Sequence, residues 1–179
     1  MNYNNYISLG IDAKIKNIQD ALNGHLGFTN VDYYGRVQKV ISKDGKKLVP
    51  EVHISNSERK EVFYDDVKAP SRNVFFVVSD KKKKKNGVLF TAEVKIVFML
   101  NLNKLEVSKD KPYRADTEIQ HHCMTLIKRL GYLDIKTLQR GLKNILSEFD
   151  TSGIVKNDLQ PYHTFSINGE IKYNFNCKN

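Results

Sequence analysis

A run in which every second residue is apolar constrains the fold of this chain more than any other feature. Within residues 87–101, all seven even positions from 88 to 100 are apolar, while Glu93 and Lys95 occupy odd positions. Side chains of a β-strand point alternately to opposite faces of a sheet, so we expect one face of this strand to lie in the core. The apolar segment 73–79 predicts a second strand, and the two are expected to form a long antiparallel hairpin.

Helical periodicity appears first near the N-terminus. Apolar residues at steps of three and four predict a helix from Ile11 to Leu26, and Gly24 and Gly27 are expected to end it.

Two further helical stripes follow Pro112. They predict consecutive helices over 116–130 and 135–149, with Asp116 and Asp134 as their N-caps. Gly131 is expected to close the first of them. Because the link between them is short, we expect the pair to pack on the same sheet face.

Patterns typical of strands also follow the N-terminal helix and recur near the C-terminus. An Asp-Gly turn between segments 31–41 and 47–54 predicts a hairpin, with Pro50 placing its second arm at a sheet edge or bulge. Between residues 55 and 70, only residues 61–64 could form a short strand. The segment 162–176 fits either a small hairpin turning at Gly169 or one long strand with a bulge there.

These elements predict a single α+β domain over residues 1–179. An antiparallel or mixed sheet of long hairpins carries the N-terminal helix and the C-terminal helix pair. We expect an N-terminal arm at 1–10, a lysine-rich hairpin tip at 79–87 and terminal strands or a tail at 161–179.

The net charge of +9 comes largely from one place. Lys81, Lys82, Lys83, Lys84 and Lys85 form one uninterrupted run, and the rest of the chain carries only +4. The chain has 23 Lys against 6 Arg, and lysine lacks the planar fork that reads base edges, so sequence-specific DNA recognition is disfavoured. The run fits either a solvated tip that prevents edge-to-edge association or a loose contact with phosphates or another partner.

Targeting signals and cysteine chemistry are not evident in the sequence. No apolar window approaches a membrane span and the first residues do not resemble a signal peptide, so we expect synthesis in a reducing cytoplasm and no membrane partner. Cys123 and Cys177 have no CxxC spacing, so neither a disulfide framework nor a zinc site is expected. We predict no cofactor and no metal.

One constellation could be catalytic. Glu93-Val-Lys95, preceded by Asp80, resembles the motif with which PD-(D/E)xK nucleases bind Mg²⁺ and polarise phosphate. The same residues also fit the solvent face of a strand, because Asp80 is out of register with Glu93.

The remaining candidates have simple structural interpretations. His121 and His122 precede Cys123 of the apolar stripe, but adjacent helical residues point about 100° apart and do not share one ion easily. His163 and Cys177 would supply only two ligands even if the tail folded back. Tyrosines and phenylalanines near the termini fit docking arms or core caps equally well.

The order of elements resembles that of small bacteriophage tail-terminator and head-to-tail joining proteins. The resemblance rests on the N-terminal helix 11–26, the long strands 73–79 and 87–101, the helix pair 116–149 and the final strand 162–175. The Asn- and Lys-rich composition is also similar to that of AT-rich phage genes, including those of crAss-like phages.

That resemblance implies a non-enzymatic structural protein of the virion. It would form a homo-oligomeric ring at the head–tail junction or tail, contact neighbouring neck, portal or tail proteins, and let packaged DNA pass without sequence specificity. Lys81 to Lys85 would then face the lumen or a neighbouring subunit. The alternative is a nucleic-acid-binding protein or metal-dependent nuclease that uses Glu93, Lys95 and the lysine run.

Overall fold

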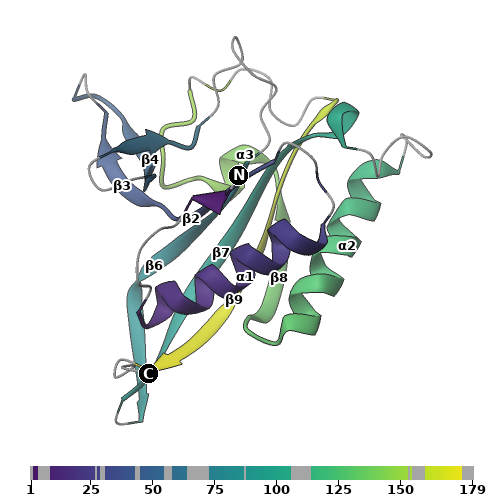
Figure 1. Ribbon diagram of the computed structural model, residues 1–179. Helices are drawn as coiled ribbons and strands as arrows, with labels where there is room; N and C mark the ends of the chain where they lie inside the picture. The colour runs from purple at the N-terminus through teal and green to yellow at the C-terminus, as the bar shows by residue number, and fades with distance from the viewer. Residues whose placement is uncertain are drawn as a thin grey trace.

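The computed structural model describes residues 2–3, 9–26, 28, 31–42, 45–54, 58–63, 73–86, 88–105, 114–152, 154 and 160–174. They form an α+β domain built on two sheets, as predicted (Figure 1). The larger sheet has six strands in the order β1-β2-β6-β7-β9-β8, and the smaller has three in the order β3-β4-β5. The strands are β1 (Asn2–Tyr3), β2 (Asp32–Arg36), β3 (Gln38–Ile41), β4 (Leu48–His53), β5 (Arg59–Glu61), β6 (Asn73–Asn86), β7 (Leu89–Asn101), β8 (Asp134–Arg140) and β9 (Tyr162–Asn174). The helices are α1 (Ile11–His25), the 3₁₀ turn η1 (Leu102–Lys104), α2 (Ala115–Leu130) and α3 (Leu142–Ile145).

Strand β7 lies in the interior of the larger sheet, and its antiparallel pairing with β6 confirms the hairpin predicted from the alternating pattern. It runs antiparallel to β6 on one side and to β9 on the other, where pairing is continuous from Leu89 opposite Asn174 to Asn101 opposite Tyr162. Parallel pairing of β1 with β2 and of β2 with β6 makes the sheet mixed.

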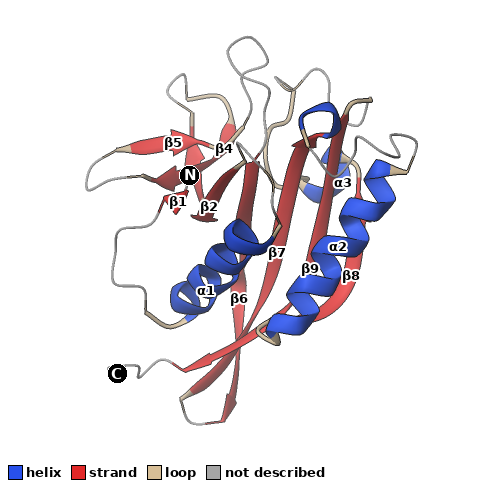
Figure 2. Ribbon diagram, turned by 45° about the vertical axis from the view of Figure 1, so that its right-hand side comes forward, coloured by secondary structure: helices blue, strands red, loops and turns tan. Residues whose placement is uncertain are grey.

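Helices α1 and α2 cover one face of the larger sheet, as Figure 2 shows. The even positions of β7 lie under them, with Ala92, Val94, Ile96, Phe98 and Leu100 all buried. The rings of Phe98 and Phe165 stack across β7 and β9 with centroids 4.6 Å apart. The predicted core face is therefore confirmed from Ala92 to Leu100, whereas Val88 is exposed; the first two predicted helices also form.

The ends of these helices differ in detail from the prediction. Gly24 does not end α1, which continues to His25, and Gly27 lies outside the described residues. In α2 the N-cap is Arg114, so Asp116 lies in the first turn, where its carboxylate suits the positive end of the helix dipole. Gly131 ends α2 in the left-handed conformation, with φ of 68°, as expected.

The opposite face of the sheet is also buried at one end. Val97 and Met99, on odd positions of β7, pack with Phe75, α3 and the residues around the small sheet. The other end of this face carries the charged residues Glu93 and Lys95, which are exposed and partly buried, respectively. The expectation of a single buried face was thus incomplete, because α3 and the small sheet supply a second apolar layer.

The prediction of a helix over 135–149 is wrong. This segment forms the edge strand β8, paired with β9, and then the single turn α3. A β-bulge between Ile135 and Thr137 adds a residue to β8, so Ile135 and Leu138 reach the same sheet face despite a helix-like spacing of three. Because α3 lies on the face opposite α2, the expected helix pair on one face does not form; α1 takes that place.

The C-terminal segment is one strand, which resolves the alternatives left open for it. β9 passes through Gly169 without interruption against β7, and the irregularity lies in β8 instead. A Cβ on Gly169 would collide with the Asp134 carbonyl oxygen and lie 2.9 Å from the side chain of Leu133. Glycine is therefore required because β8 approaches β9 too closely for a side chain.

The predicted hairpin of residues 31–54 forms, but its first arm is divided between the two sheets. β2 joins the larger sheet, whereas β3 pairs with β4 in the smaller one. Pro50 lies in the central strand β4 and not at an edge, contrary to expectation. Its carbonyl accepts a hydrogen bond from Val62 N at 3.0 Å. Pro50 has no N–H to donate to the Val62 carbonyl. That carbonyl instead accepts a hydrogen bond from the Asn73 side chain at 2.8 Å.

Both predicted terminal segments join the larger sheet. Asn2 and Tyr3 of the expected arm pair with Tyr33 and Tyr34, and Tyr173 of the expected tail is buried in the core. Tyr6, Phe175 and Cys177 lie outside the described residues. Within the described part of the chain, none of the helices is long and apolar enough to cross a membrane.

Candidate functional site

The lysine run lies in a strand and not in a loop. β6 continues to Asn86, so Lys82, Lys83 and Lys84 pair with Ala92, Thr91 and Phe90 of β7. The predicted tip at 79–87 is thus corrected: β6 continues to Asn86, which pairs with Leu89 of β7. Figures 1 and 2 show this distal part of the hairpin extending past α1 and α2.

The lysine-rich half of β6, residues 79–86, has the character of an edge strand. Pairing with β2 involves Asn73, Val74 and Phe76, at the other end of β6. The register with β7 shifts between Val78 and Lys82 and again between Lys84 and Asn86. Bulges and lysines are both devices that keep a sheet edge from pairing at random.

Glu93 and Lys95 point from β7 to the polar end of the second sheet face. The Lys95 ammonium donates to the Ile145 carbonyl oxygen at 2.6 Å and lies 4.0 Å from the Glu148 carboxylate. Glu148 also forms an ion pair with Lys39 at 2.6 Å. Lys95 is therefore tied to α3 and the segment after it, a role that fixes the packing of that turn on the sheet.

A second carboxylate, missed by the sequence reasoning, lies beside Glu93. Glu170 of β9 is directly opposite Glu93, and Asp134 of β8 is directly opposite Glu170. We call these three residues the carboxylate row. Cross-strand neighbours lie on the same face of a sheet, with Cβ atoms about 5 Å apart. A hydrogen bond from Lys136 at 2.6 Å lowers the pKa of Asp134.

The polar end of this face is hollowed into a cavity of about 750 Å³ between the sheet, β3 and α3. Glu93, Lys95, Glu148 and Glu170 line it. Asp80, the third member of the nuclease-like pattern, lies in β6 where the register with β7 shifts. No group of three or more His, Cys, Asp or Glu side chains in the described ranges is arranged to hold a metal ion.

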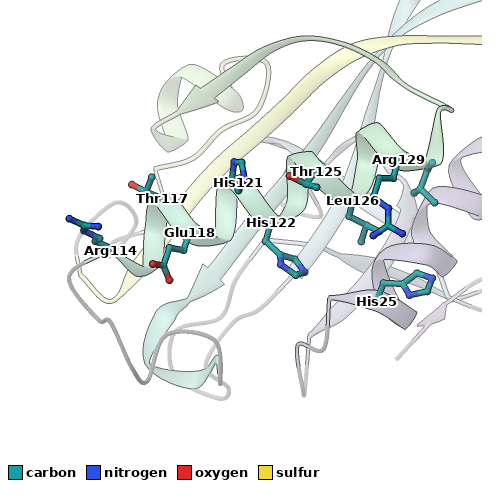
Figure 3. Close-up of a pocket in the computed structure, with 10 residues that line it drawn as sticks. His25, Arg114, Thr117, Glu118, His121, His122, Thr125, Leu126 and Arg129 are labelled. Carbon is teal, nitrogen blue, oxygen red and sulfur yellow. The ribbon is translucent and has the colours of Figure 1, made fainter.

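A second hollow lies on the outer side of α2, and the sequence reasoning did not find it. This α2 groove, of about 820 Å³, is shown in Figure 3. It is lined by His25, Arg114, Thr117, Glu118, His121, His122, Thr125, Leu126, Arg129 and Leu130.

The two histidines that the sequence singled out thus line a groove, and not the core. His121 and His122 are exposed, whereas Cys123 is wholly buried, and burial raises the pKa of its thiol. In Figure 3, His122 and Arg129 project from α2 on the side where His25 lies. The spacing of Arg114, His121 and Arg129 by seven and eight residues marks this stripe in the sequence, but nothing local relates His25 to it.

A polar network ties α2 to the sheet at its N-terminal end. Arg140 donates to both Asp116 and Gln120 at 3.1 Å, and the Gln120 amide donates to His163 at 2.7 Å. His163 is therefore committed to a structural contact between α2 and β9. Cys177, the other residue considered with His163 and not expected to form a site with it, lies outside the described part of the chain.

Comparison with known proteins gave no match, either to a protein-family model or to a curated protein.

Proposed function

We propose that this chain is a non-enzymatic assembly subunit that forms a homo-oligomeric ring at the head–tail junction or tail of a bacteriophage. The observation that carries the proposal is the presence of two chemically different surfaces on one sheet: the lysine-rich half of β6 and the carboxylate row. A closed ring built head to tail requires two such different, complementary patches on every subunit.

Charge and exposure support this pairing of surfaces. The lysine-rich half of β6 holds five consecutive lysines, of which Lys84 is exposed in the described structure. Glu93 and Asp134 in the carboxylate row are exposed, and Glu170 is partly exposed. We infer that the lysines of one subunit meet the carboxylate row of the next, which leaves other faces of the ring for neighbouring virion proteins. Complementary charges of this kind favour the correct partner and register.

Native mass spectrometry tests the ring. The expected result is a closed oligomer whose mass is a whole multiple of 20.6 kDa. Reversing the carboxylate row with Glu93→Lys and Glu170→Lys should dissociate the oligomer. Changing Lys81 to Lys85 to Glu in the same chain should restore it. Dissociation without restoration would show that these two surfaces do not meet.

The second candidate function is a metal-dependent nuclease. It is supported by the position of Glu93 opposite Glu170, with Lys95 on the same sheet face. Two carboxylates and a lysine around one cavity could bind Mg²⁺ and orient a phosphate. Incubating the chain with DNA and Mg²⁺ distinguishes the two functions. Cleavage that disappears in Glu93→Ala would support the nuclease and overturn the assembly proposal.

A further inference from the structure

We propose that the α2 groove binds single-stranded nucleic acid. The inference stands on the surface of α2 and the end of α1 alone, and it does not rest on the proposed ring. The groove gathers three of the five histidines and two of the six arginines of the chain on one hollow surface.

The arginines set the charge and the length of the ligand. Among the described residues that line the groove, Arg114 and Arg129 are accompanied by one acidic residue, Glu118, so this surface attracts anions. Arg129 lies fifteen positions after Arg114, which corresponds to about 22 Å along the axis of α2. That distance exceeds the size of one phosphate group, so the groove suits a polymer with repeated phosphates. The planar guanidinium is the side chain best matched to phosphate oxygens.

The other lining residues favour exposed bases over a duplex. His25, His121 and His122 are all exposed in the groove, and flat imidazole rings stack on unpaired bases. Leu126 and Leu130 are partly buried and give the groove an apolar side next to the core. A duplex presents mainly phosphates to such a surface and hides the faces of its bases. An acidic peptide would use the arginines but would leave the imidazoles without stacking partners.

Fluorescence anisotropy with a labelled oligothymidylate of about 12 nucleotides tests the inference, since single-strand sites commonly cover about 4–16 nucleotides. Arg129→Ala should weaken binding and make the slope of log K against log salt shallower by about 0.7, the share of one phosphate contact. His122→Ala should weaken binding about fivefold or more through lost stacking, with the salt slope unchanged.

Matched controls come from the small sheet. Arg59 and His53 are exposed neighbours on β5 and β4, away from the groove residues. Arg59→Ala and His53→Ala remove the same side-chain types and should leave both the affinity and the salt slope as in the unmodified chain. A thermal melt of each variant checks that the fold is retained.

Four outcomes would overturn the inference. They are no binding of the oligothymidylate, equal binding of a duplex, equal competition by polyglutamate, and loss of binding on removing Lys81 to Lys85 while Arg129→Ala has no effect. Polyglutamate competition would assign the groove to an acidic protein partner instead. A monomeric chain that binds the oligothymidylate through Arg129 and His122 would support the groove and contradict the ring, so the two proposals fail independently.

Discussion

Replacing Gly169 with alanine tests the part of the fold that differs most from the sequence prediction. The added Cβ would collide with the Asp134 carbonyl oxygen and lie 2.9 Å from both the Asp134 carbonyl carbon and the Leu133 side chain. Backbone atoms cannot rotate away, so β8 must shift from β9. Overpacking of this kind costs about 1–3 kcal/mol. Alanine offsets up to about 1 kcal/mol of this cost, because it loses less conformational entropy than glycine when the chain folds into a strand. We expect the free energy of unfolding to fall by about 1–2 kcal/mol.

Urea unfolding followed by circular dichroism measures this change, and a thermal melt should show a midpoint lower by about 2–8 °C. Gly24→Ala is the matched control. Gly24 is exposed in α1 and an added Cβ meets nothing within 4 Å among the described residues, so stability should rise by about 1 kcal/mol. If Gly169→Ala is as stable as the unmodified chain, β8 does not pack against β9 as described, and residues 134–140 are not its edge strand.

Three further predictions concern Tyr33, Asn73 and the lysine run. The buried Tyr33 hydroxyl meets no hydrogen-bond partner among the described residues, so Tyr33→Phe should raise stability by about 1 kcal/mol in urea unfolding at neutral pH. Burial raises the pKa of Tyr33, so the unfolded chain loses this proton first and stability falls as the pH rises above about 10; Tyr33→Phe should make that fall shallower by about 1.4 kcal/mol per pH unit. Asn73→Ala should cost about 1–3 kcal/mol by leaving the Val62 carbonyl unpaired, whereas the exposed Asn144→Ala should cost little; equal losses would contradict the role of Asn73. Changing Lys81 to Lys85 to Ser should leave the melting temperature nearly unchanged, and a large drop would show that this edge of β6 is not exposed.

The elements that could be predicted from the sequence are those whose apolar residues repeat with the period of one buried face. The alternating residues of β7 and the stripe of α1 each face a single dominant core, so pattern and structure agree. The prediction of a helix over 135–149 was wrong for a physical reason. A bulge in β8 places Ile135 and Leu138 on one face, and the resulting spacing of three cannot be distinguished from a helix by periodicity alone.

Contacts distant in sequence account for the other differences. Pro50 occupies a central strand because Asn73, far along the chain, replaces the hydrogen bond that proline cannot make. In the α2 groove, the stripe of Arg114, His121 and Arg129 is visible in the sequence, but His25 joins it only through the packing of α1 beside α2. The carboxylate row is likewise assembled from three strands by their register.

Negative-stain electron microscopy of the purified chain, alone and with the products of neighbouring genes, tests the proposed function most directly. The account predicts closed rings in the unmodified chain and separate subunits after Glu93→Lys and Glu170→Lys. Particles that stay monomeric under both conditions, or open filaments unaffected by the two substitutions, would contradict it.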